Sequence, residues 1–460
     1  MTDTTRYDIA LIGGGASGTL VAMQVLQQAT GPMRIVMIEP GPVGRGVAYS
    51  TTQSEHLLNV PAARMSAFVD VPDDFVAFLG DQHGFDVFDP STRARVFAPR
   101  RLYAAYLTDR LAQVCADSVA MLDVVADRAI GCVAIDEGVD ITLESGQTLH
   151  VRDAVIALGN TPKPVPLPAD APAHSDPRVL GAWDYPALKR IDPDADITII
   201  GAGHSMVDAM LSLDAQGHRG PIHVLSRTGR MPLPHASAHG AAGFDALSLR
   251  DLPLRGRMRA LRQAMAHAAA EHIPWQDVMD RVRPHVRTLW ASMDPADTRR
   301  FLRHVVRQWD VHRHRIAPQV HALLQAAMAS GQLQLHRGRL LAIDTSGSRL
   351  QVHADGLDGA QTWASDVVIN AVGLETRVSR MGHAVLDSLV FRGDARPALQ
   401  ALGLDTDASG AVRRADGSAH ARLHAIGSLR IGTLWESIAV PELRQDAQAL
   451  ATRILASQQH

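Results

Sequence analysis

Short apolar runs of strand length alternate with helical patterns in two parts of the chain. Residues 7–12 form the first run, a helical stretch extends from residue 19 to about residue 29, and a second run covers residues 34–38. The same order of strand, helix and strand returns between residues 196 and 225. Alternation of this kind is typical of folds with a parallel sheet. The pattern therefore predicts two α/β units in one chain.

A glycine-rich turn follows the first predicted strand. It reads Gly13-Gly14-Gly15-Ala16-Ser17-Gly18, and Glu39 ends the second strand 21 positions after Gly18. Gly13 permits a tight turn, Gly15 lets the backbone approach a pyrophosphate, and Gly18 lets helix and strand pack closely. The amino end of the helix attracts phosphate, and Glu39 would accept hydrogen bonds from ribose hydroxyls. We predict a dinucleotide site formed by Gly13, Gly15, Ala16, Ser17, Gly18 and Glu39.

A second glycine loop, Gly201-Ala202-Gly203-His204-Ser205-Met206, follows the strand at residues 196–200, with Met206 where a third glycine would stand. The next strand ends in Ser226-Arg227, where an NAD site would carry an acidic residue. An arginine there can pair with a 2′-phosphate, which predicts NADPH, although Arg227 as a solvated loop charge stays open. His204 and Ser205 are expected to line the nicotinamide site. We assign Gly201, Gly203, His204, Ser205, Ser226 and Arg227 to this cofactor.

Two apolar strands that end in glycine flank the second unit. Residues 153–160 contain Gly159 and lead into a proline-rich segment, and residues 366–373 end at Gly373. Both are interpreted as places where the chain crosses between nucleotide domains. The predicted fold class is α/β with two Rossmann-like domains, the second inserted in the first. The first domain would comprise residues 1–165 and 366–460 and bind FAD, and residues 166–365 would bind NADPH.

Residues 250–330 carry a helical pattern within the inserted part. Four helices are expected, with breaks near Pro274, near Pro295 and at residues 310–314. Val278, Val282, Val286 and Trp290 recur every four residues, which predicts a buried helical stripe. We expect this region, about residues 245–335, to cap the groove between the two nucleotide domains.

Composition and charge exclude several classes of function. Apolar residues make up 46% of the 460 residues, enough for large buried cores. The formal net charge is −3, so neither a nucleic acid nor a membrane is expected as partner. Two cysteines, Cys115 and Cys132, cannot form a disulfide framework, and no metal site is predicted. No signal peptide or membrane span is recognised, which predicts a cytoplasmic protein. A homo-oligomer stays open.

Several longer motifs resemble one protein family. They include residues 44–50, residues 56–68, Pro99-Arg100-Arg101-Leu102-Tyr103, residues 309–315 and residues 427–436. Together they are similar to FAD/NAD(P)-binding proteins related to flavin-dependent N-hydroxylating monooxygenases, in the branch of the aspartate N-hydroxylases (nitrosuccinate synthases). The resemblance implies flavin contacts from Arg45, Gly46, Asn59, Arg64, Met65 and Ser66, with Met65 as ordinary core packing left open.

Two departures from the family pattern concern the carboxyl-terminal part. Ala371-Val372-Gly373-Leu374 stands where the branch often has Cys-Thr-Gly-Pro, and a Gly-Asp pair that binds the flavin ribityl chain in many such proteins is missing. The backbone around Gly427, Gly432 and Thr433 would have to take over that contact.

The cap region is rich in arginine and histidine. Arginines flank His312 and His314 and would repel a metal ion, so these residues either form a solvated face or grip an anion. For the second case, Arg303, Arg313 and Arg315 are the candidates to hold a substrate carboxylate or the NADPH phosphates.

The chain lacks the motifs of nucleophilic catalysis, which fits an enzyme whose cofactor supplies the chemistry. The resemblance implies an FAD- and NADPH-dependent monooxygenase that uses O₂ and a C4a-hydroperoxyflavin to N-hydroxylate a small amino acid or amine, with L-aspartate as candidate. The alternatives are an NAD(P)H:acceptor flavin oxidoreductase, acting on a quinone, nitro compound or protein, and a non-catalytic FAD/NADPH-binding sensor. The catalytic residues stay unassigned.

Overall fold

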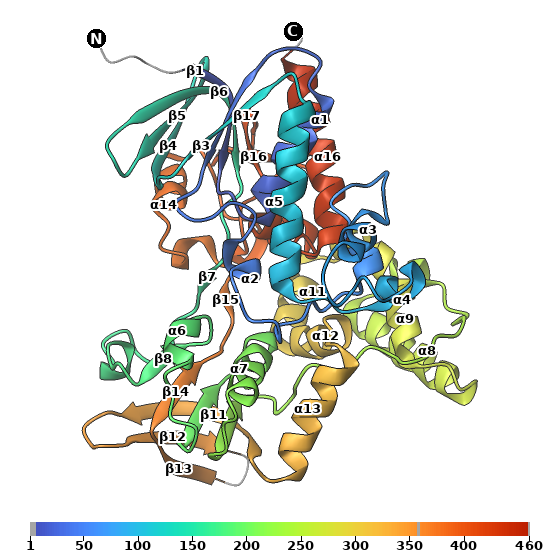
Figure 1. Ribbon diagram of the computed structural model, residues 1–460, viewed down its shortest axis with the longest axis vertical. Helices are drawn as coiled ribbons and strands as arrows, with labels where there is room; N and C mark the ends of the chain where they lie inside the picture. The colour runs from blue at the N-terminus through green and yellow to red at the C-terminus, as the bar shows by residue number, and fades with distance from the viewer. Residues whose placement is uncertain (1–5, 357–358, 459–460) are drawn as a thin grey trace.

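The computed structural model describes residues 6–356 and 359–458, and it contains two large β-sheets with a helical subdomain at their side. In Figure 1 the first sheet lies in the upper half, the second in the lower half, and the helices α8, α9, α11 and α12 lie to the right of the second. Within the described ranges, no helix combines the length and apolar composition that crossing a bilayer requires.

The first sheet has eight strands in the order β16-β17-β6-β1-β2-β3, with β5 beside β6 and β4 beside β5. The pairs β1–β2, β1–β6, β2–β3 and β6–β17 are parallel, and β4, β5 and β16 are antiparallel to their neighbours. The bounds are β1 Arg6–Ile12, β2 Arg34–Ile38, β3 Met121–Val125, β4 Ala129–Ile135, β5 Gly138–Leu143, β6 Thr148–Ile156, β16 Ala411–Arg413 and β17 Ala419–Ala425.

Helices cover both faces of this sheet. Leu20, Tyr103 and Leu450 belong to one buried cluster and come from α1 (Ala16–Gln28), α5 (Arg100–Asp117) and α16 (Val440–Ser457). The other face packs against α14 (Ala384–Arg392). Burial on both faces explains why β1 and β2 are continuous apolar runs rather than alternating ones.

The second sheet has seven strands in the order β13-β12-β11-β10-β9-β14-β8. Its central strands are parallel, and α7 (His204–Ala215) and α13 (Pro318–Ala329) cover one face. The strand bounds are β8 Val179–Gly181, β9 Ile197–Ile200, β10 Ile222–Ser226, β11 Leu333–Asp344, β12 Leu350–Gly356, β13 Gly359–Ser365 and β14 Val367–Asn370.

The chain passes between the sheets twice, through an antiparallel pair of short strands, β7 (Thr161–Pro162) and β15 (Leu374–Glu375). β6 ends at Ile156 and β14 at Asn370, several residues before the predicted strand ends. The carbonyl oxygens of the next residues, Ala157 and Ala371, lie beside Gly13 and Gly201 of the two glycine loops. The α/β fold class with two nucleotide-binding units is confirmed, and the residue limits of the domains stay a prediction.

The cap comprises α8 (Leu254–Ala270), α9 (Trp275–Val282), α10 (Val286–Ala291), α11 (Pro295–Arg300), a π-helical turn (Phe301–Val305) and α12 (Val306–Arg313). The breaks at Pro274 and Pro295 are confirmed, since proline is accepted only at the start of a helix. The break expected at residues 310–314 is wrong in position, because α12 continues to Arg313. Val278, Val282, Val286 and Trp290 are buried as predicted.

The remaining elements are short. The helices are α2 (Gly46–Tyr49), α3 (Asp74–Gly80), α4 (Pro90–Arg95), α6 (Tyr185–Leu188) and α15 (Ile431–Leu434). The 3₁₀ turns are Ala62–Arg64, Pro172–His174, Ala246–Leu249, Arg283–His285, Val378–Arg380, Leu399–Ala401 and Gly427–Arg430.

Candidate active site

The first glycine loop has the geometry of a dinucleotide cradle. Gly13 adopts φ +107°, and a Cβ there would lie 2.7 Å from the Ala157 carbonyl oxygen. A Cβ on Gly18 would lie 2.0 Å from the Gly13 carbonyl oxygen, so α1 packs directly on the turn. A Cβ on Gly15 would meet no close contact, since its nearest neighbour, the Gly46 Cα, would lie at an ordinary contact distance of 3.5 Å. The loop is therefore tight where protein packs on it and open where a pyrophosphate would approach.

Glu39 stabilises this loop through hydrogen bonds. Its two carboxylate oxygens accept hydrogen bonds from the Gly14 N–H at 2.8 Å and the Gly41 N–H at 2.9 Å. A carboxylate can accept more than one bond at each oxygen, so these contacts leave capacity for ribose hydroxyls. The ribose role of Glu39 stays a prediction.

The residues expected along the flavin differ in accessibility. Arg45, Gly46 and Arg64 are exposed and Asn59 is partly exposed. Met65 is buried in the first core, and the Ser66 hydroxyl bonds the carbonyl oxygens of Phe68 and Val71 within its own loop. Met65 and Ser66 thus have structural tasks that account for their presence, whereas Arg64 has a free approach to a ligand.

The carboxyl-terminal segment returns to the first loop at Gly427. This residue adopts φ +75°, and a Cβ would lie 2.5 Å from the Ser17 hydroxyl oxygen at the start of α1. Gly432 serves packing, because a Cβ there would lie 2.1 Å from the Leu402 carbonyl oxygen. Thr433 follows on α15, while Gly159 and Gly373 lie on the two crossings with open space around them.

The second glycine loop repeats the first. Gly201 adopts φ +109°, and its Cβ would lie 2.3 Å from the Ala371 carbonyl oxygen. Gly203 and His204 begin α7, and Ser205 and Met206 are buried in it. Burial lowers the pKa of His204 to about 4, and its Nε2 lies 3.5 Å from the Arg315 carbonyl oxygen. A neutral imidazole therefore stands at the amino end of α7.

A polar network that no sequence motif indicated joins the two glycine-loop units. Arg100 on α5 forms two hydrogen bonds of 2.7 and 3.0 Å with Asp208 on α7. The buried His56 ring contacts the Asp208 carbonyl oxygen at 3.1 Å and the Ser212 hydroxyl at 2.9 Å. His56 begins the family motif of residues 56–68, and Arg100 belongs to the motif Pro99-Arg100-Arg101-Leu102-Tyr103. Both motifs therefore also hold α7 against the first unit.

The three cap arginines have different surroundings. Arg303 is exposed on the π-helical turn. Arg313 is 8% exposed and donates to Glu436 at 2.5 Å, so its charge is compensated by protein. Arg315 is 3% exposed and pairs with Asp280 through Nη2 only, whereas its Nε and Nη1 have no partner within the described part of the chain. Arg313 Nε also lacks a partner among the described residues, so Arg315, with two such nitrogens, has the most buried donors still to satisfy.

Arg315 belongs to a larger charged cluster where the cap meets residues 56–68. Although the Arg64 side chain as a whole is exposed, partial desolvation of its guanidinium and the neighbouring Arg283 lower its pKa. Burial outweighs Asp280 in lowering the pKa of Arg315. The cluster contains the cations Arg64, Arg283, Arg313 and Arg315 and the carboxylates Asp280, Glu436 and Glu442. Four positive charges thus face three negative ones.

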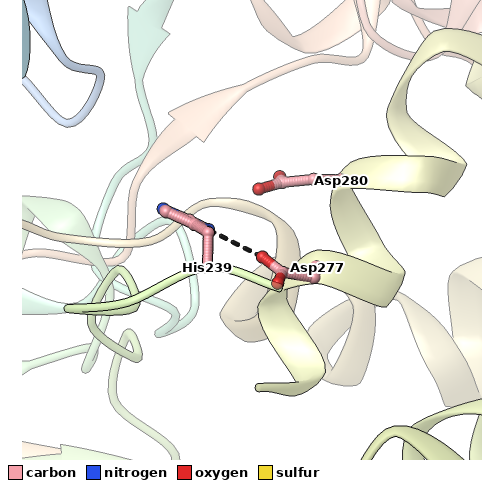
Figure 2. Close-up of side chains that lie close together, drawn as sticks. All are labelled: His239, Asp277 and Asp280. Carbon is pink, nitrogen blue, oxygen red and sulfur yellow. Dashed lines mark hydrogen bonds and ion pairs between the residues drawn. The ribbon is translucent and has the colours of Figure 1, made fainter. Parts of the chain in front are cut away.

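Asp280 also belongs to the group His239, Asp277 and Asp280 shown in Figure 2, whose ligand atoms lie within 4.8 Å of one another. The Asp277 oxygens accept from His239 Nδ1 at 2.6 Å and from the Gly240 N–H at 2.5 Å, and Asp280 pairs with Arg315. A cation would have to displace these partners beside a guanidinium, so we assign no metal to this group.

The comparison with protein families bears on the first loop. Residues 10–161 match the family described as FAD-NAD(P)-binding. This FAD-NAD(P)-binding region runs from β1 through β6 to the first crossing, so the predicted cofactor class is confirmed for the first unit. No curated protein matches the chain by sequence.

Solved structures match nearly the whole chain at low identity. The ornithine N-hydroxylase of Kutzneria sp. 744 is 12% identical with a TM-score of 0.67, over 99% of this chain and all of that one. The FAD-bound cadaverine monooxygenase of Erwinia amylovora is 14% identical with a TM-score of 0.68, over 98% of this chain and 94% of that one. A bacillithiol disulfide reductase of Staphylococcus aureus is 13% identical with a TM-score of 0.57, over 99% of each chain. These likenesses establish the fold.

Proposed function

We propose that the protein is an FAD- and NADPH-dependent monooxygenase that hydroxylates the amino group of a small, acidic amino acid, with L-aspartate as the candidate substrate. When bound, the two cofactors supply the reducing equivalents and the activation of O₂. The chain's own tasks are to hold FAD on the first glycine loop and NADPH on the second, to exclude water and to orient the substrate amine. The ornithine N-hydroxylase and the cadaverine monooxygenase, which have the same fold, support this reaction class.

The observation that carries the substrate class is the unsatisfied Arg315 guanidinium. It is buried, two of its nitrogens lack partners among the described residues, and Arg64 is close enough to perturb it. A carboxylate between Arg64 and Arg315 would satisfy these donors and balance the surplus charge of the cluster. Ornithine and cadaverine carry a second ammonium group, which this cluster would repel.

Proton handling follows from the same surroundings. Burial and the neighbouring Arg315 lower the pKa of His235 to about 4, and its Nε2 donates to the Asn59 carbonyl oxygen at 2.9 Å. Beside these cations and neutral imidazoles, a substrate ammonium group would lose its proton more readily than in water. The unprotonated amine is the nucleophilic form that N-hydroxylation requires.

The proposal is tested with the FAD-loaded protein, NADPH and air. Aspartate, glutamate, asparagine and ornithine are offered separately, and products are examined by mass for the gain of one oxygen atom. We expect oxygen gain with an acidic amino acid. Gain with ornithine alone would make the substrate class wrong, and rapid NADPH oxidation with a quinone but without oxygenated product would favour the acceptor oxidoreductase.

Arg315→Ala tests the assigned contact. Loss of a charged hydrogen bond predicts a rise of about tenfold or more in KM for the acidic substrate, while the rate of flavin reduction by NADPH stays unchanged. Arg299→Ala, which removes an exposed arginine of α11, is the matched control. If Arg315→Ala slowed flavin reduction and left KM unchanged, the residue would belong to the NADPH site.

A further inference from the structure

A pocket of about 580 Å³ lies between the helical cap and the loop after β10. Thr228 and Arg230 of that loop and Arg337 of β11 line it on the side of the second sheet. The cap lines the rest, through α8, α9, the π-helical turn and α12. The volume is within the range of roughly 300–1,000 Å³ that small-molecule sites occupy.

Every lining residue of this pocket that can carry a charge is an arginine or a histidine. They include Arg230, Arg262, Arg307, Arg337, His304 and His312, and no carboxylate lines the pocket within the described residues. Burial lowers the pKa of Arg307, the nearby Arg227 and Arg230 lower it further, and Asp310 only partly offsets them. Like charges held around a hollow repel one another, and a bound anion would relieve that repulsion.

The other part of the lining is apolar. Met258, Leu261 and Met265 of α8 face the pocket beside the basic residues. An apolar surface next to a group of arginines suits a ligand that joins a flat, weakly polar ring to phosphate groups. An inorganic anion alone would leave the apolar surface uncovered.

The position of the pocket follows the course of a dinucleotide. Arg337 is the register partner of Ser226, where β10 ends and a 2′-phosphate is expected. Arg307 Nη2 donates to the carbonyl oxygens of Ala202 and Arg230, both at 2.7 Å, and its Nη1 lies 3.9 Å from a Cβ placed on Gly203. Arg307 thus connects the pocket to the second glycine loop, and Arg337 connects it to the end of β10.

We propose that the cap is part of the NADPH site: Arg262 of α8 and Arg337 of β11 bind the 2′-phosphate, Arg307 of α12 binds the pyrophosphate, and the adenine ring lies on Leu261 and Met265. This inference rests on the proposed use of NADPH. It gives the arginine-rich cap a task at the cofactor, in addition to the substrate contact at Arg315. Cofactor preference is then set by two parts of the protein, the strand ends of the second sheet and the cap.

Binding of two nucleotides to the FAD-loaded full chain tests the proposal without any turnover. Isothermal titration should show that adenosine 2′,5′-bisphosphate binds at least about tenfold more tightly than AMP, because only the former carries the 2′-phosphate. Arg262→Ala should remove most of this difference. Arg307→Ala should weaken the binding of both nucleotides to a similar extent, since both carry the 5′-phosphate.

Arg259→Ala is the matched control, because Arg259 lies on the same helix, is exposed and does not line the pocket. It should change either affinity by less than about twofold, and the thermal midpoint without nucleotide reports that each variant is folded. If Arg262→Ala and Arg307→Ala bind like the wild type while Arg337→Ala does not, the cap has no part in the site. If the wild type does not prefer the bisphosphate, NADPH use itself is wrong, whereas oxygen gain with NADH would still support hydroxylation.

Discussion

At the scale of single residues, Gly18 is the position of the first glycine loop that least tolerates an added side chain. A Cβ there would lie 2.0 Å from the Gly13 carbonyl oxygen, so Gly18→Ala has to move the turn or α1. We expect a loss of roughly 2–4 kcal/mol in unfolding free energy and a protein that is purified without flavin. Flavin absorbance per chain and urea unfolding measure both effects.

Gly31→Ala is the control for that substitution, because a Cβ on Gly31 would have no atom within 4 Å. Its effect should stay within about 0.5 kcal/mol. Full flavin content and wild-type stability in Gly18→Ala would contradict the packing of α1 on the turn.

His235 makes stability depend on pH in a definite direction. Its pKa is lowered to about 4 in the folded protein, while an unfolded histidine titrates near 6.5, so the unfolded chain takes up this proton first as pH falls. His235 therefore makes its full contribution to the free energy of unfolding above about pH 6.5, and this contribution is lost as the pH falls toward 4. His235→Gln, which can still donate to Asn59, should reduce the wild-type loss between pH 7.5 and 5 by about 1–2 kcal/mol, allowing for solvent screening.

Chemical denaturation at the two pH values measures this difference. An equal loss in the variant and the wild type would mean that His235 is not neutral in the folded protein. His204, whose pKa is also lowered to about 4, adds to the same decline and is unaffected by the substitution, so only the difference between the two proteins is diagnostic.

The residues that the sequence predicted best are those whose role is steric and local. Gly13, Gly18 and Gly201 are required by contacts with their own turns and the neighbouring crossings, and the motif spacing contains that information. The partners of Arg313 and Arg315 lie 123 and 35 positions away, at Glu436 and Asp280. Spacing along the chain cannot indicate such pairs. Three equivalent cap arginines were therefore expected, whereas in the structure Arg303 is exposed, Arg313 has one unsatisfied buried nitrogen and Arg315 has two.

At the scale of elements, helix ends followed the prolines and apolar stripes. Pro274 directly precedes α9 and Pro295 begins α11. The stripe from Val278 to Trp290 is buried although the 3₁₀ turn Arg283–His285 interrupts it. The π-helical turn Phe301–Val305 had no signal, since it shifts the hydrogen-bond register without requiring proline or glycine. That turn places His304 and Val305 in the basic pocket, so the unpredicted element is also one that lines a candidate site.

At the scale of the whole molecule, the two sheets are held in place by charge pairs that cross between elements far apart in sequence. Arg100–Asp208 joins α5 to α7, and Arg283–Glu442 and Arg287–Asp446 join the cap to α16. The order of the domains could be predicted from two glycine loops and two crossings. Their mutual orientation could not, because it depends on these long-range pairs and on the buried His56.

Arg100–Asp208 is the pair whose loss should separate the two glycine-loop units. The side chains are 17% and 5% exposed, so removing one partner leaves the other charge buried without compensation. Arg100→Ala is expected to cost about 3–5 kcal/mol, whereas the double substitution Arg100→Met with Asp208→Leu should cost less. Because the lost contact lies between the units, thermal unfolding of Arg100→Ala should show two separated transitions where the wild type shows one.

Arg219→Ala, which breaks an exposed pair with Asp194, is the control and should change the free energy of unfolding by no more than about 0.5 kcal/mol. A single, uniformly lowered transition in Arg100→Ala would mean that the units unfold together without this pair, and the orientation would then rest on the apolar contacts around His56 and Tyr185.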